Sequence, residues 1–342
     1  MSLQFVMGGA GSGKTRYLYQ TAIKQAVEQP DRLFLFVVPE QYTMQTQKEL
    51  VRLHPRKGLM NMDVLSFKRL AYRVFEDLGV QVPAVLDDMG KSLVLRKVAA
   101  ARKKNLRLFG SHLEQSGFIG ELKSMLSELF QYGISEETIR EMADSADSAM
   151  LRQKLSDMSE LYEGFREYTR ERFIAQEEIL DILCRVLPKS RLIRGSVVTL
   201  DGYTGFTPVQ YRLLELLLTC CRQVVVTVTM PPEENPYREK PIQNLFHMSS
   251  HTVCRLTDSA SGTGAGRDED ILLTGPCRRF QNSPALSAIE RGLFRPWAGR
   301  FEGAQGDSLL LHEAENPIGE IQFVCTEIQH LVKEKGYRYR DI

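Results

Sequence analysis

The chain has 342 residues, a formal net charge of +1, 43% hydrophobic residues and 25% charged residues. This composition is typical of a globular protein of two or three domains and argues against a disordered or fibrous chain. A net charge near zero excludes a global positive field for nucleic acid, so any DNA contact must come from a local groove. No apolar run is long enough to cross a membrane and no signal peptide is evident, so we expect a cytoplasmic protein.

The cysteines show no Cys-x-x-Cys spacing, which makes a zinc or iron–sulfur site built from these residues alone unexpected. Scattered cysteines of this kind are typical of thiols in a reducing compartment. They are Cys184, Cys220, Cys221, Cys254, Cys277 and Cys325.

The first predicted element is an apolar strand, residues 3–7, which leads directly into a glycine-rich loop. The loop fits Gly-x-x-x-x-Gly-Lys-Thr without a mismatch, the signature of a phosphate-binding loop. Its glycines allow successive backbone N–H groups to face one concavity and bind phosphate oxygens. The predicted nucleotide-binding residues of this loop are Gly8, Gly9, Ala10, Gly11, Ser12, Gly13, Lys14 and Thr15.

Two side chains at the end of the loop have specific predicted roles. Lys14 supplies a positive charge for the outer phosphates, and the Thr15 hydroxyl can coordinate Mg²⁺. Apolar residues recur at helical spacing through residues 16–28, which predicts a helix whose N-terminal dipole strengthens the anion site.

Two further strand and helix pairs follow. The predicted strands are residues 32–38 and 62–67, and the predicted helices are residues 44–53 and 68–78. Continuous apolar strands alternating with helices favour a parallel sheet covered on both faces. Ligands of such sheets lie at the carboxyl ends of the strands, so the residues after each strand are expected beside the phosphate-binding loop.

Residues 87–187 show helical periodicity and no predicted strand, which indicates an inserted helical subdomain. The sheet resumes with the strand 196–201, which ends in Asp201. An acid at the end of another strand of the sheet completes the Mg²⁺ site of phosphate-loop proteins, so Asp201 is the predicted metal ligand together with Thr15. Asp201 could instead be a strand-end cap.

The remaining elements are less regular. We predict a helix and a strand that continue the sheet, a loop, another helix, a flexible linker, and then a strand and a helix after which the sheet should continue. The chain therefore reads as a fragment. In order, these elements are residues 207–219, 224–229, 230–236, 243–256, 259–267, 308–312 and 317–335.

A phosphate-binding loop domain with a long helical insertion before its magnesium strand resembles the first motor domain of superfamily-one helicases. Five runs make the likeness closer, and together they resemble the AddB (RexB) family, which forms one half of a bacterial helicase–nuclease that processes double-strand DNA ends for recombinational repair. The likeness extends through nearly the whole chain. The runs are residues 8–15, 37–42, 64–70, 200–210 and 279–286.

The resemblance implies an α/β fold: a P-loop (RecA-like) parallel sheet with an inserted all-helical subdomain. The motor domain would occupy residues 1–86 and 191–300, the insertion 87–190, and the start of a second motor domain 301–342. It also implies ATP and Mg²⁺ as cofactors, an AddA-type partner in a heterodimer, and single-stranded and double-stranded DNA ends as ligands, with Chi recognition possible. A nuclease domain with an iron–sulfur cluster is expected only in the full-length protein.

The resemblance places further site residues. Arg279 lies where related helicases keep an arginine that reaches the γ-phosphate, although an ordinary surface arginine is the equal alternative. Residues at two strand ends match motifs that contact single-stranded DNA, although each could be a turn residue, and the two aromatic ones could be buried. The predicted DNA contacts are Glu40, Gln41, Tyr42, Thr43, Ser66, Phe67 and Arg69.

One position departs from active helicases, which follow the metal-binding aspartate with a glutamate that activates water. Here that position is Gly202. General-base catalysis contributes roughly 10²–10⁴-fold, so nucleotide binding with weak or no hydrolysis is expected. No upstream glutamine motif for reading adenine is expected either. The alternatives are an independent phosphate-loop ATPase or kinase that uses the nucleotide chemically, and a relic loop that binds nothing.

Overall fold

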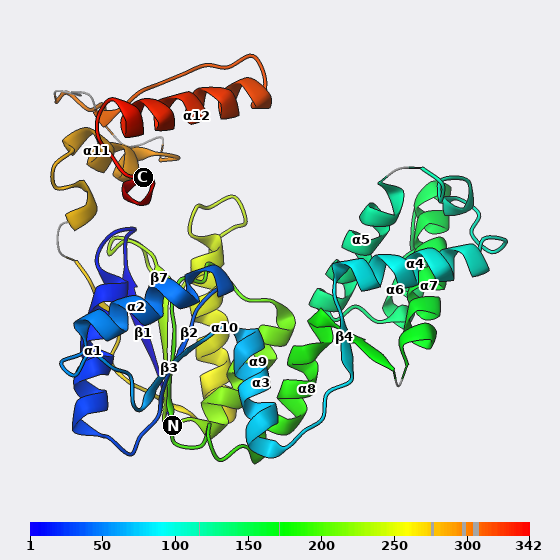
Figure 1. Ribbon diagram of the computed structural model, residues 1–342, viewed down its shortest axis with the longest axis horizontal. Coiled ribbons are helices and arrows are strands. Elements are labelled where there is room, and N and C mark those ends of the chain that lie inside the picture. The colour runs from blue at the N-terminus through cyan, green and yellow to red at the C-terminus, as the bar shows by residue number, and fades with distance from the viewer. Residues whose placement is uncertain (116, 171, 275–276, 296–298, 304–307) are drawn as a thin grey trace. The chain divides into compact units, whose positions relative to one another are not determined.

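The computed structural model describes residues 1–115, 117–170, 172–274, 277–295, 299–303 and 308–342 (Figure 1). The chain divides into two compact units, Met1–Pro276 and Cys277–Ile342, and each is described by itself. This division differs from the predicted boundary at residues 300 and 301, and the predicted four-part domain organisation stays a prediction.

The first unit is built on a parallel sheet with the strand order β3-β2-β6-β7-β1-β8, and β9 also pairs with β1. Every pair in this sheet is parallel. Strands far apart in the sequence therefore end at one edge. The strands are β1 (Ser2–Gly8), β2 (Phe34–Val37), β3 (Met62–Leu65), β6 (Val197–Leu200), β7 (Gln223–Thr229), β8 (Gly266–Arg267) and β9 (Ile271–Leu272).

Helices cover both faces of the sheet (Figure 1). Side chains alternate along each strand: Phe34 and Phe36 join one apolar cluster, and Leu35 and Val37 join the other. This burial on both faces explains why the strands are almost continuously apolar. One face carries α1 (Lys14–Glu28) and α2 (Thr43–Leu53); the other carries α3 (Phe67–Leu78), α8 (Ile179–Val186), α9 (Pro208–Cys220) and α10 (His247–Thr263).

The segment between α3 and α8 is mostly helical and has a separate apolar core that includes Leu95, Leu122 and Phe165. The sequence predicted no strand here, and that prediction is wrong at one point, because β5 (Phe173–Ala175) pairs in parallel with β4 (Ala84–Leu86). Three residues are too few to show a period in the sequence. The helices are α4 (Asp88–Ala101), α5 (Phe118–Tyr132), α6 (Glu136–Asp144) and α7 (Ala149–Thr169).

The predicted flexible linker at residues 259–267 is wrong. Helix α10 continues to Thr263, with Ala260 buried one turn after Leu256, and Gly264 ends the helix at φ 70°. Gly266 and Arg267 then form β8. The small and polar residues of this segment are typical of a linker, but packing against the sheet stabilises them as a helix.

The second unit contains α11 (Pro284–Gly292) and α12 (Pro317–Lys333). The predicted helix over residues 317–335 is confirmed, and the predicted strand over residues 308–312 is wrong, because those residues form no strand. Across the described residues of both units, no helix combines the length and apolar character needed to span a bilayer. Short 3₁₀ turns are η1 (Glu40–Tyr42), η2 (Phe109–Ser111), η3 (Gln176–Glu178), η4 (Leu187–Lys189), η5 (Arg278–Phe280) and η7 (Tyr339–Asp341).

Candidate nucleotide-binding site

The loop between β1 and α1, residues 8–15, has the backbone that its glycines predict. Gly11 has φ 75° and Gly13 has φ 98°, a region that residues with a Cβ rarely adopt. Gly13 is the N-cap of α1 and no side chain caps the helix. Amide groups at the start of an uncapped helix suit an anion.

Two side chains of the loop bear on phosphate binding. The Lys14 Nζ donates to the carbonyl oxygens of Gly8 and Gly9, at 2.9 Å each. The Ser12 Oγ is buried and has no hydrogen-bond partner among the described residues. A buried hydroxyl without a partner costs free energy, so this one fits a loop that a phosphate oxygen completes.

The predicted metal ligands meet, although 186 residues separate them in the chain. The Thr15 Oγ1 donates to the Asp201 Oδ2 at 2.8 Å. Asp201 is only 8% exposed, and its Oδ1 accepts a second hydrogen bond, of 2.8 Å, from the Oγ1 of Thr227 in β7. Parallel strands bring these groups to one edge of the sheet.

This pair fits Mg²⁺, which binds oxygen ligands and is commonly held by one or two carboxylates together with substrate phosphates. Thr15 and Asp201 provide one hydroxyl and one carboxylate beside the glycine-rich loop. Among the described residues, no group of three or more His, Cys, Asp and Glu side chains is placed to hold a metal. The donor set therefore suits a metal that arrives with a nucleotide.

The residue after Asp201 adopts a backbone that glycine favours. Gly202 has φ 81°. A Cβ at this position would lie 3.5 Å from Pro39 Cδ and 3.8 Å from Tyr42 Cδ2, atoms of the segment that follows β2. A glutamate here would adopt a strained backbone, and its side chain would begin toward that segment.

The turn after Gly202 is anchored by aromatic rings. The Tyr203 ring lies 5.2 Å from Phe67 and 5.2 Å from Phe206, measured between centroids. Burial raises the pKa of Tyr203 well above its ordinary value. This cluster joins the end of β6 to the start of α3.

The seven predicted DNA contacts divide by exposure. Thr43, Ser66 and Phe67 are each about 5% exposed, and Thr43 Oγ1 donates to the Glu40 carbonyl oxygen. A base could reach Phe67 only after its aromatic cluster opens, so this contact stays an untested prediction. The exposed residues are Glu40, Gln41, Tyr42 and Arg69.

Part of this predicted surface is brought together across the two strand ends. Arg69 Nε donates to Glu40 Oε1 at 2.9 Å, with both side chains more than half exposed. Hydrogen bonds lower the pKa of Glu40; the one with Ser66 has the larger effect and the one with Arg69 the smaller. Ser66 also accepts from the Arg69 backbone N–H as the N-cap of α3.

Arg279 belongs to the second unit, where it is exposed on η5. Each unit is described by itself, so the predicted contact between Arg279 and a γ-phosphate stays a prediction.

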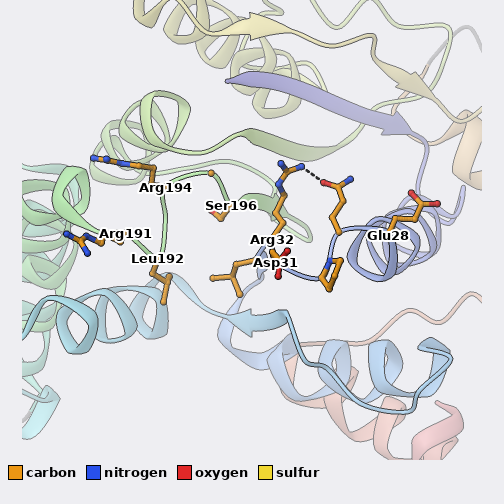
Figure 2. A pocket seen from close by; sticks show the side chains of 11 residues that line it. Glu28, Asp31, Arg32, Arg191, Leu192, Arg194 and Ser196 are labelled. Carbon is orange, nitrogen blue, oxygen red and sulfur yellow. Dashed lines mark hydrogen bonds between the residues drawn. The ribbon is translucent and has the colours of Figure 1, made fainter.

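A cavity of about 680 Å³ lies at the opposite, amino edge of the sheet, where residues 28–33 and 191–196 precede β2 and β6 (Figure 2). Arg32, Arg191 and Arg194 line it together with Glu28 and Asp31. In Figure 2 the side chains of Arg191 and Arg194 extend away from Arg32, which donates to Gln29. The lining side chains carry charges of both signs and do not point toward one common position, so this cavity has no evident ligand.

Thr227 is the site residue that sequence reasoning missed. It occupies the middle of an apolar run, Val224–Val228, and nothing local distinguishes it from a strand threonine. Its place beside Asp201 comes from the pairing of β6 with β7, which the sequence does not reveal. The one feature that could have indicated a role for Thr227 is that it is a polar residue within a buried, otherwise apolar run.

The sequence was also compared with known protein families and with characterised proteins. A sequence model of the family described as "ADDB, N-terminal" matches residues 5–290. Three similar proteins are each named as the B subunit of an ATP-dependent helicase/deoxyribonuclease: those of Lachnoclostridium phytofermentans (41% identical), Desulforudis audaxviator (35%) and Desulforamulus reducens (34%). Each alignment covers 100% of this chain and 30%, 29% and 30% of the respective relative. The chain thus spans less than a third of the length of these relatives.

Proposed function

We propose a function from one premise: this chain belongs to the family described as ADDB, N-terminal. We infer that it is the nucleotide-binding part of a helicase/deoxyribonuclease of the AddB type that processes DNA double-strand ends in recombinational repair. It binds ATP with Mg²⁺, contacts DNA, and hydrolyses ATP weakly or not at all. Its fold would be the first motor domain of a superfamily-one helicase, with residues 87–190 inserted as a helical subdomain.

The hydrogen bond from Thr15 to Asp201 is the single observation that carries the nucleotide proposal. A glycine-rich turn that matched the motif by chance would have no reason to meet a buried carboxylate at the end of another strand. In this proposal the loop amides and Lys14 bind the phosphates, and Thr15 and Asp201 hold Mg²⁺. Bound Mg²⁺ would neutralise charge on the phosphate oxygens.

To bind a phosphate, Lys14 must give up two hydrogen bonds within the loop. Its ammonium donates to Gly8 and Gly9 carbonyl oxygens, and a phosphate would replace these neutral acceptors with charged ones. Hydrogen bonds between two charged groups are stronger than those to a neutral carbonyl, so the exchange favours the nucleotide.

Weak hydrolysis follows from Gly202, which provides no carboxylate and has a positive φ. The alternative, an independent ATPase or kinase, needs a group to activate the attacking water or hydroxyl. In the sequence after Asp201 the next carboxylate is Glu215, on α9. The turn after Asp201 therefore favours a binding role over a chemical one.

The DNA contact is proposed for the exposed surface beside the site. Glu40, Gln41, Tyr42 and Arg69 lie at the ends of β2 and β3, on the edge that holds the phosphate-binding loop. Tyr42 is 47% exposed and can stack on a base, and Arg69 can bind a backbone phosphate after release from Glu40. An AddA-type partner completes the proposal, and any nuclease domain with an iron–sulfur cluster would lie in parts that the relatives have beyond this match.

Titration of a fluorescent ATP analogue with Mg²⁺ tests the nucleotide proposal. Lys14→Ala should weaken binding about 10- to 100-fold, because a hydrogen bond to a charged group contributes roughly 1.5–3 kcal/mol. Lys24→Ala, at an exposed lysine of the same helix, is the matched control and should bind as the wild type does. Equal affinity of the wild type and Lys14→Ala would remove the nucleotide from this account.

A hydrolysis assay separates the two functions. The wild-type chain should show little turnover with or without single-stranded DNA. Brisk turnover independent of DNA would favour the independent ATPase and contradict the proposed binding role.

A further inference from the structure

Thr227 contacts the predicted metal ligand at the carboxylate oxygen that Thr15 does not bond. Its side chain belongs to β7, is 6% exposed, and donates from Oγ1 to Asp201 Oδ1 at 2.8 Å. The same hydroxyl lies 3.4 Å from the Leu200 carbonyl oxygen. A hydroxyl has a single proton to donate. The contact with the Asp201 carboxylate is the shorter one and involves a charged acceptor, so it is the stronger of the two.

The backbone fixes Thr227 on both sides. Strand β7 pairs in parallel with β6, where Leu200 faces Val226, and with β1, where Val6 faces Thr227. Threonine is branched at Cβ, so its χ1 angle has few accessible values in such a strand. The hydroxyl is therefore held in place before any ligand binds.

The two oxygens of Asp201 thus have separate partners. Oδ1 accepts from Thr227, and Oδ2 accepts from Thr15. Rotation about the last torsion of an aspartate is broad, so a carboxylate with one partner would sample several orientations. Two partners from different elements fix the plane of this one.

We propose that Thr227 is a positioning residue for the magnesium–nucleotide site: its hydroxyl holds Asp201 Oδ1 so that Oδ2 faces Thr15. This inference deepens the proposed function and rests on it. Residues that orient a metal ligand typically change metal affinity by about 10- to 100-fold when they are removed. Loss of the Thr227 hydroxyl should therefore weaken the magnesium-dependent part of nucleotide binding and spare the part that the loop alone provides.

The test compares two affinities of each protein for a fluorescent ATP analogue, one with Mg²⁺ and one with EDTA. Thr227→Val keeps the shape and the strand preference and removes the hydroxyl. We expect the ratio of the two affinities to fall about 10-fold, with the affinity in EDTA unchanged. Thr227→Ser keeps a hydroxyl and should restore the ratio.

Thr199→Val is the matched control. Thr199 is a 4% exposed threonine of β6 two residues before Asp201, and among the described residues its hydroxyl does not bond that carboxylate. This variant should keep the wild-type ratio. Thr227→Ala repeats the loss of the hydroxyl with a smaller side chain, so a folding defect of Thr227→Val leaves the inference open to test.

The melting temperature without nucleotide separates positioning from a purely structural role. A structural role predicts a lower melting temperature and an unchanged ratio in Thr227→Val and Thr227→Ala, which would overturn the inference. A wild type that binds with Mg²⁺ and a Thr227→Val with the same ratio would overturn the inference and leave the proposed function standing. A wild type that binds no analogue would overturn both.

Discussion

The two edges of the parallel sheet differ in how their polar groups are arranged. At the carboxyl edge, Thr15 and Thr227 come from different elements and each donates a hydrogen bond to Asp201, in a region where Asp201 and Thr227 are buried. At the amino edge, a concavity of about 680 Å³ is lined by Arg191 and Arg194, which are exposed.

The comparison teaches that convergence of buried polar groups marks a site better than the size of a cavity. Burying a carboxylate costs free energy unless other groups satisfy it, so a fold keeps one at a strand end only with dedicated partners. Exposed arginines carry no such cost and need no ligand. The predictions below test this contrast between the edges.

The largest effect is expected at Gly202, on the carboxyl edge. Gly202→Glu should lower the free energy of unfolding by about 1–2 kcal/mol, because a residue with a Cβ is strained in the left-handed region. It should also fail to raise ATP hydrolysis, since the new side chain begins toward Pro39 and Tyr42. Urea unfolding and a phosphate-release assay measure the two effects.

Gly202→Ala is the control for this variant, because it adds the strain without the carboxylate and should cost a similar free energy. Unchanged stability together with a clear gain in turnover would show that the turn accepts a catalytic glutamate, against our account.

A smaller effect is expected for Glu40 beside the same edge. Its folded pKa lies below the ordinary value of 4.5 because Ser66 and then Arg69 hydrogen-bond its carboxylate. The charged form is therefore favoured by folding, and its contribution is present above pH 4.5 and is lost as the pH falls through the folded pKa. Both side chains of the Glu40–Arg69 pair are more than half exposed, so this contribution should stay below about 1 kcal/mol.

Glu40→Gln measures this contribution. Urea unfolding at pH 7 should show a small loss of stability, which disappears at pH 3 and shrinks in high salt. Glu28→Gln, at an exposed glutamate that ends α1, serves as the control. A loss of equal size at pH 7 and pH 3 would assign it to packing instead of charge.

The smallest effect is expected at the amino edge. Arg191→Ala and Arg194→Ala, alone or together, should change the free energy of unfolding by less than about 0.5 kcal/mol and leave ATP-analogue affinity unchanged. Fluorescence titration of the double variant beside Lys14→Ala checks this. A tenfold loss of affinity in the double variant would make the amino edge part of the site and break the comparison.

Much of the first unit was predictable from the sequence because its elements have strong periods. The apolar runs at β1, β2, β6 and β7 and the helices beside them lie where the pattern placed them. The failures occur where tertiary contacts outweigh local composition. Ser259–Thr263 read as a linker but form the end of α10, since Leu256 and Ala260 are buried against the sheet. Residues 308–312 read as a strand but form none.

The candidate site was partly predictable for a similar reason. The glycine-rich loop and Asp201 are local signals, one a motif and the other an acid after an apolar run. Thr227 could not be predicted as a site residue, because a threonine in a strand has many possible neighbours. The burial of Phe67 and Ser66 was also hidden, since a residue at a strand end can face either solvent or the next helix.

The sequence by itself determined the glycine backbone of the loop, the amphipathic helices and the buried strands, because each depends on residues close together in the chain. The tertiary structure alone decided that Thr15, Asp201 and Thr227 meet, since the order β6-β7-β1 places them together over long sequence separations. Strand order is set by packing of the whole sheet, and no local pattern encodes it.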